Sequence, residues 1–312
     1  MMKIVFCGTP EFAVPSLQAI VDAGHQVPLV LTQPDRPAGR RQEIQIPPVK
    51  QHATKLGLAV LQPERIKNNL ELRATLEHLV PDAIVVVAYG RIIPPWMLDL
   101  PRFGNINVHG SLLPKYRGAA PIQWAVANGE SETGITTMRL DPGLDSGDTL
   151  LFHKVSIGPD TTATELYPQL AQDGAKLLIK TLSGLECGSI QPQPQDHAAA
   201  TLAPILTRED GRMDLLQRTA QQTYNRWRGF TPWPGAHAVF RGKRFIIHKM
   251  HMSCSKQTLI PSQMDASTGE LLVGAAQHTS LALDEVQVEG KPRLPGSQFA
   301  KDFQLRAGER LA

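Results

Sequence analysis

Apolar residues over the first 185 or so positions alternate between strand-like runs and helix-like spacing. The segment Asp82–Ala88 is almost continuously apolar, which is typical of a strand covered by helices on both faces. Helices are indicated by two apolar series with helical spacing, Val14, Leu17, Ile20 and Val21, and then Leu166, Leu170, Leu177 and Leu178. Further strands are predicted at 3–7, 27–31, 58–61, 105–109 and 134–140. This alternation predicts an α/β domain with a mainly parallel, Rossmann-like sheet.

The pattern breaks between residues 187 and 207, where prolines, glutamines and then alanines replace the periodic apolar positions. Such a composition is typical of a linker. Beyond it, 208–223 has helical character, and β-like runs follow at 236–250, 270–274 and 280–288. We therefore predict a first domain at 1–189, a linker at 190–207 and a small, mostly β second domain at 208–312.

Three segments with candidate chemistry fall at the carboxyl ends of predicted strands, where open α/β sheets form their sites. These are Gly8-Thr9-Pro10, Tyr89-Gly90 and Asn107-Val108-His109. The first has neither a G-x-G-x-x-G pattern nor a P-loop lysine, so a plain tight turn and no nucleotide cofactor are predicted there.

The composition is that of an ordinary globular protein, with 42% apolar and 20% charged residues. No run approaches the roughly 18 apolar residues of a membrane span, and strand-like residues follow Lys3 at once in place of a signal peptide. A cytoplasmic protein with no membrane partner is expected. Cys7, Cys187 and Cys254 lack metal-ligand spacing, so no zinc site is predicted, and Cys7 is interpreted as a small buried apolar residue.

Positive charge is concentrated in the C-terminal third of the chain. Residues 201–312 carry 15 Lys and Arg against 10 Asp and Glu, while residues 1–200 carry 17 against 19. A basic module on a neutral body suggests a polyanionic partner, and a nucleic acid is one candidate. A solvated surface with surplus lysine and arginine explains the same charge equally well.

Asn107, His109 and Asp145 form a candidate catalytic set for acyl transfer to an amine. That reaction passes through a tetrahedral species whose negative oxygen needs hydrogen-bond donors, and a group must also take a proton from the nitrogen. Asn107 and His109 are two apart on a predicted strand and so share a face. By itself an N-x-H pattern is usually structural, and an aspartate in a Gly-rich turn usually serves the turn.

Two longer motifs favour a catalytic role over a structural one for these residues. The segment Asn107–Pro121, NVHGSLLPKYRGAAP, closely resembles the signature of the folate-dependent formyltransferases, and Asp141–Asp148, DPGLDSGD, resembles their aspartate motif. The resemblance implies that Asn107 and a protonated His109 stabilise the oxyanion while Asp145 orients His109 and assists proton transfer. It further implies that the co-substrate is 10-formyltetrahydrofolate, that no metal is required, and that the folate site is lined by Ser111, Leu112, Leu113 and Pro114.

Three segments, the second overlapping the longer motif, resemble the members of this family that formylate initiator methionyl-tRNA: 32–41, 118–124 and 230–236. The resemblance implies that Arg36, Arg40 and Arg41 contact the tRNA, and that the second domain is an OB-like β-barrel that binds it. A monomer is expected. Two alternatives remain open: a formyltransferase acting on a small amine such as a nucleotide or amino sugar, and a non-catalytic RNA-binding protein. Consumption of tRNA as the acceptor separates the first alternative from the tRNA-formylating members of the family, and the intact Asn107, His109 and Asp145 set speaks against the second.

Overall fold

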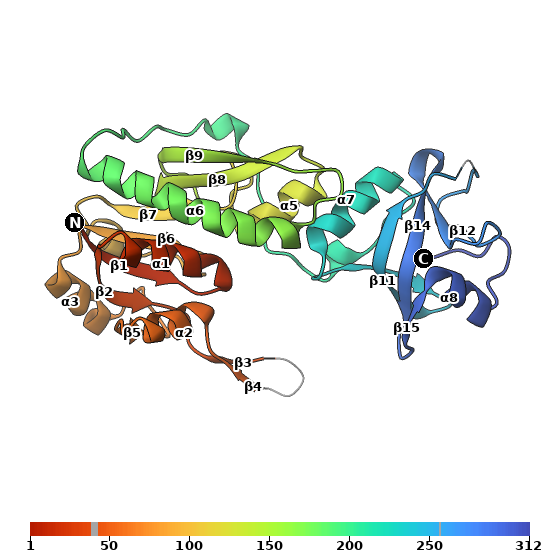
Figure 1. Ribbon diagram of the computed structural model, residues 1–312, viewed down its shortest axis with the longest axis horizontal. Coiled ribbons are helices and arrows are strands. Elements are labelled where there is room, and N and C mark those ends of the chain that lie inside the picture. Colours follow the sequence, from red (N-terminus) through yellow and green to blue (C-terminus); the bar gives the residue numbers. More distant parts are fainter. Residues whose placement is uncertain (39–42, 256) are drawn as a thin grey trace. The chain divides into compact units, whose positions relative to one another are not determined.

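The computed structural model describes residues 1–38, 43–255 and 257–312, which divide into two compact units (Figure 1). The first unit comprises Met1–Pro121, Glu132–Ser156 and Leu166–Pro204. The second comprises Ile122–Ser131, Ile157–Glu165 and Ile205–Ala312. Each unit is thus built from three chain segments, and the stretch predicted as a linker lies in the first unit as far as Pro204.

The first unit is built on a seven-stranded sheet in the order β5-β2-β1-β6-β7-β8-β9. Its first five strands are parallel, and β8 and β9 are antiparallel. The strands are β1 Lys3–Gly8, β2 Gln26–Leu31, β5 Val60–Leu61, β6 Ala83–Val87, β7 Asn105–His109, β8 Glu132–Arg139 and β9 Thr149–Ser156. The predicted mainly parallel, Rossmann-like sheet is therefore confirmed.

Helices of the first unit cover this sheet. They are α1 Val14–Asp22, α2 Pro48–Lys55, α3 Leu70–Leu79, α4 Pro95–Leu98 and α6 Ala163–Glu186, the last of which begins in the second unit. Strand β6 is buried along its whole length, because alternate residues face opposite sides of the sheet and both sides are covered. Ile84 and Val86 pack in a cluster with Leu72 and Leu76 of α3. A short hairpin, β3 Arg36–Ala38 and β4 Glu43–Gln45, stands apart from this sheet.

The second unit contains a six-stranded sheet whose pairings are all antiparallel, in the order β10-β11-β14-β13-β12 with β15 against β14. The strands are β10 Ala236–Phe240, β11 Lys243–Met252, β12 Met264–Asp265, β13 Leu272–Ala275, β14 Thr279–Val288 and β15 Arg293–Pro295. Its helices are α5 Pro121–Ala127, whose first residue belongs to the first unit, α7 Ala220–Phe230 and α8 Gly296–Asp302. The sheet is a half-barrel, which confirms a small β second domain.

The helix predicted at 208–223 is wrong in position. Residues 209–211 form one 3₁₀ turn, and the regular helix α7 begins only at Ala220. The reason is a capping box: the Thr219 hydroxyl accepts the Gln222 N–H at 3.2 Å, and the Gln222 side chain accepts the Thr219 N–H at 3.0 Å. This pair satisfies backbone donors that open a helix, so it fixes the start at that point.

Candidate active site

Strand β7 carries two of the three predicted catalytic side chains to the carboxyl end of the parallel part of the sheet. Asn107 and His109 are separated by one residue and therefore project from the same face. Asn107 is half-buried, whereas His109 is buried with 6% of its surface exposed. Asn107 pairs with Val86 of β6 and with Met138 of β8, and His109 pairs with Thr136 of β8. The strand thus presents an amide and an imidazole from a rigid element.

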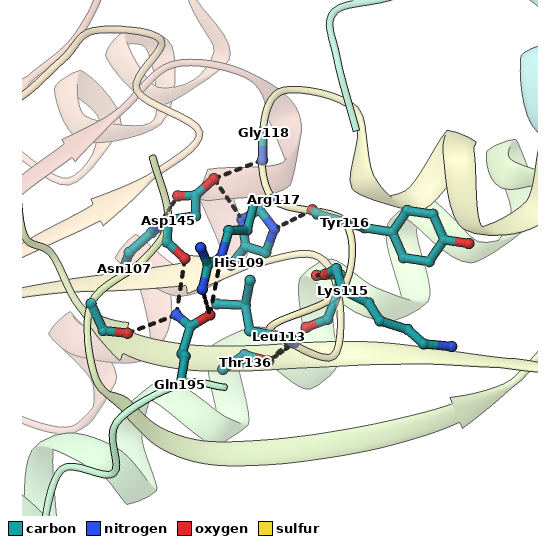
Figure 2. Close-up of polar contacts among 12 residues, drawn as sticks. Asn107, His109, Leu113, Lys115, Tyr116, Arg117, Gly118, Thr136, Asp145 and Gln195 are labelled. Atoms are coloured by element: carbon teal, nitrogen blue, oxygen red, sulfur yellow. Dashed lines mark hydrogen bonds and ion pairs between the residues drawn. The ribbon is translucent and has the colours of Figure 1, made fainter. Parts of the chain in front are cut away.

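Asp145 completes the set from the loop between β8 and β9 (Figure 2). One carboxylate oxygen, Oδ1, accepts a hydrogen bond from Asn107 Nδ2 at 3.3 Å. The other, Oδ2, accepts the backbone N–H of Gly118 at 2.9 Å and lies 3.7 Å from His109 Nδ1. The structure therefore brings together the three residues that the sequence singled out.

The two ring nitrogens of His109 have different partners. Nε2 lies 2.9 Å from the carbonyl oxygen of Tyr116, which can only accept, so Nε2 carries a hydrogen and donates it. Nδ1 faces Asp145 at a distance beyond ordinary hydrogen-bond range. Nδ1 is therefore the nitrogen of His109 that remains for proton transfer or for donation to a reacting group.

Left-handed backbone recurs around this imidazole and carboxylate. Asp145 has φ 47° and Tyr116 has φ 62°, values that side-chain-bearing residues rarely adopt and that cost about 1–3 kcal/mol each. Gly118 has φ 120°, and a Cβ there would lie 2.7 Å from the carbonyl oxygen of Ala203. Only glycine fits this position, and its N–H is thereby aimed at the Asp145 carboxylate. Such strain persists where surrounding contacts over-determine the conformation, as they do at functional sites.

The predicted folate segment 111–114 forms the turn that follows β7. Ser111 is fully buried, and its hydroxyl donates to the Lys115 carbonyl at 2.6 Å. Thr136 of β8 fastens the same turn, because its hydroxyl donates to the Ser111 carbonyl at 2.6 Å and accepts the Leu113 N–H at 3.0 Å. Ser111 and Leu113 thus support the turn from within.

The other two members of this segment differ in exposure. Leu112 and Pro114 are half-buried. They leave apolar surface available at the turn.

Two family models match this chain. Residues 2–182 match the family model described as formyl transferase, and residues 205–304 match the formyl transferase C-terminal domain. The chain is 57% identical over 310 residues to methionyl-tRNA formyltransferase of Acidobacterium capsulatum, covering 99% of both chains. The chain belongs to the methionyl-tRNA formyltransferase family.

Other matches agree with this membership. The relative named methionyl-tRNA formyltransferase in Koribacter versatilis is 56% identical over 99% of this chain and 98% of its own length. Among solved structures, an N-formyltransferase of Helicobacter canadensis superposes with a TM-score of 0.67 at 18% identity, covering 91% of this chain and 99% of that one. At that identity the likeness shows the fold alone.

Of the three arginines predicted to contact tRNA, the structure places one. Arg36 lies on β3 with its side chain exposed, and its guanidinium forms an ion pair with Glu64 at 2.9 Å. Arg40 and Arg41 fall outside the described residues.

Two polar residues at this site were missed by the sequence analysis, Arg117 and Gln195. Arg117 is 9% exposed and Gln195 is 7% exposed, and the two side chains are hydrogen-bonded to each other. Gln195 lies in the stretch predicted as a linker, where its neighbours gave no sign of burial. The only available signal was three glutamines at alternate positions, 191, 193 and 195.

Within the described residues, no group of three or more His, Cys, Asp or Glu side chains is arranged to hold a metal ion. No helix in the same part of the chain is long and apolar enough to cross a membrane.

Cys7 is fully buried, and burial raises the pKa of its thiol, as expected for a residue that packs in the core.

Proposed function

We propose that this protein transfers a formyl group from 10-formyltetrahydrofolate to the α-amino group of methionyl-initiator tRNA. The observation that carries the proposal is the convergence of Asn107, His109 and Asp145 at one strand end, in a chain matched end to end by relatives named methionyl-tRNA formyltransferase. The formyl donor supplies a one-carbon unit bonded to its N10 nitrogen. In the transfer, a bond forms from the amine nitrogen to the formyl carbon and the bond to N10 breaks.

Asn107 is proposed to stabilise the oxygen that becomes negative in the tetrahedral intermediate. Its amide has two N–H groups, and the structure uses one of them on Asp145. The other is available to a substrate oxygen. Because Asp145 already orients this amide, the donor is held in place before the charge develops, which is the condition for efficient stabilisation.

His109 and Asp145 are proposed to act together on the proton. With Nε2 committed to the Tyr116 carbonyl, an imidazolium at His109 donates from Nδ1 to the oxyanion, and the nearby carboxylate stabilises that positive charge. Asp145 assists transfer of the amine's proton to the departing N10. No net charge is left on the protein after one turnover.

Other residues are proposed to hold the two substrates. Leu112 and Pro114 offer half-buried apolar surface to the folate, and Arg36 offers an exposed positive charge to tRNA phosphate. The basic surplus of 201–312 suits backbone contacts to RNA that weaken as salt rises. We propose that the protein does this as a monomer.

The test is a formyl-transfer assay with 10-formyltetrahydrofolate and two acceptors in parallel, charged initiator methionyl-tRNA and an amino-sugar nucleotide. The proposal expects formylated methionyl-tRNA and no transfer to the sugar. Transfer to the sugar alone would keep the chemistry and overturn the acceptor. Binding of folate with transfer to neither would overturn the activity.

A further inference from the structure

The stretch 190–204 is fastened along the active site. Gln193 and Thr149 of β9 exchange two backbone hydrogen bonds of 2.8 Å. Further along, the Arg117 N–H donates to the Thr201 carbonyl at 2.8 Å, and the Ala203 N–H donates to the Arg117 carbonyl at 2.7 Å. This stretch therefore contacts both the β8–β9 region and the segment after β7, the two parts of the chain that form the site.

Gln195 lies between these two attachments, and the hydrogen bonds of its side-chain amide point into the site (Figure 2). Its Nε2 donates to the carbonyl oxygens of Asp145 at 2.9 Å and Gly147 at 2.7 Å. Its Oε1 accepts from Arg117 Nη2 at 2.7 Å and from Nε at 3.2 Å. The orientation of the amide is unambiguous, because carbonyl groups only accept and a guanidinium only donates.

These bonds act on the backbone that carries the proposed catalytic carboxylate. Asp145 has a left-handed φ of 47°, and Gln195 holds its carbonyl and that of Gly147. Arg117 directly precedes Gly118, whose N–H binds the Asp145 carboxylate at 2.9 Å. The Gln195–Arg117 pair thus joins the loop that carries the carboxylate to the loop that holds its oxygen.

Arg117 is a buried charged residue whose side chain bonds to neutral partners. Its guanidinium is buried, and its hydrogen bonds go to the neutral amide of Gln195 and to His197 Nδ1 at 3.1 Å. Burying a charge against neutral partners is costly and is a poor way to gain stability. The place of Arg117 beside the active site is better explained by the geometry that it imposes.

We propose that Gln195 and Arg117 are positioning residues that fix Asp145 relative to Asn107 and His109 for formyl transfer. This inference rests on the function proposed above. It assigns to the segment between the two family-model matches, 183–204, a part in the chemistry.

The experiment compares Gln195→Glu with Gln193→Glu in formyl transfer to methionyl-tRNA. Glu at 195 keeps the shape but turns two donated bonds into contacts between oxygens, which displaces the Asp145 loop. We expect kcat to fall roughly 10- to 100-fold, with the KM for tRNA unchanged. Gln193 is exposed, and within the described residues its side chain bonds to the carbonyl of the nearby Gln191, so its variant is expected to match the wild type. Equal kcat for the two variants would overturn the inference.

A double variant separates positioning from general structural damage. If Gln195 acts through Asp145, then Gln195→Glu in an Asp145→Asn background should cost less than about 3-fold, because the group it positions is already lost. A full 10- to 100-fold further loss would overturn the inference. Should Gln195→Glu fail to fold, Gln195→Met serves in the same cycle. Wild-type protein without any transfer activity would instead contradict the proposed function.

Discussion

Replacing Asp145 by Asn is expected to abolish most of the activity with little change in stability. The variant keeps the size of the side chain but removes the charge that faces His109 Nδ1 at 3.7 Å. With His109 in the imidazolium form proposed for the transfer step, opposite charges at that distance attract by about 4 kcal/mol at the effective dielectric constant of about 20 that suits protein sites. Both side chains are largely buried, with 6% and 13% exposed, so solvent screens this attraction little. Loss of most of this term corresponds to a roughly 1,000-fold lower kcat.

The folded state should tolerate the change. An Asn side chain can still accept the Gly118 N–H through its oxygen, and Asn107 can rotate its own amide to accept from the new NH₂ group. Single-turnover formyl transfer gives the rate, and thermal unfolding gives the stability. Asp99→Asn is the matched control, since Asp99 is an exposed carboxylate that precedes the opposite end of β7. An Asp145→Asn protein with kcat within about 3-fold of wild type would refute the electrostatic argument.

Gly118, Tyr224 and Arg36 each give a further measurable effect. Gly118→Ala, which forces a side chain into a left-handed backbone against a carbonyl, should lower the free energy of unfolding in urea by about 1–3 kcal/mol; an unchanged midpoint would contradict it. Burial, with the hydrogen bond to Asp160, raises the pKa of Tyr224 to about 12. The unfolded chain releases the phenolic proton near pH 10, so the wild-type protein should lose stability as the pH rises from 10 toward 12. In Tyr224→Phe that part of the loss should be missing, and identical pH profiles would count against the assignment. Arg36→Ala should raise the KM for tRNA, leave kcat unchanged and reduce the slope of log affinity against log salt by about 1. The control is Arg73→Ala, which removes another exposed, ion-paired arginine and should change none of these quantities.

Much of the fold could be predicted from local patterns. The continuous apolar run of β6 indicates a strand covered on both faces, and this can be seen from the local sequence alone. The face shared by Asn107 and His109 followed from strand periodicity alone. The start of α7 could also have been found, because Thr219 and Gln222 have the spacing of a capping box. The weaker helical pattern upstream, at 208–218, forms one 3₁₀ turn at 209–211 in place of a regular helix.

The remainder of the site depends on contacts between distant parts of the chain. Gln195 meets partners 48 to 78 residues away, and no pattern near it distinguishes it from the exposed glutamine at 193. The role of each nitrogen of His109 depends on the carbonyl of Tyr116, which a left-handed backbone aims at the ring. Hydrogen bonds of this kind are set by the tertiary fold, so periodicity and composition carry no record of them.

The most direct test of the central claim is to identify the product formed from charged initiator methionyl-tRNA and 10-formyltetrahydrofolate. After incubation with the wild-type protein, the amino acid is released from the tRNA and analysed by mass spectrometry. The account predicts methionine carrying one formyl group on its α-nitrogen, and no such product with the Asp145→Asn protein on the same timescale. Unmodified methionine from the wild-type reaction, with active donor and intact charged tRNA, would contradict it.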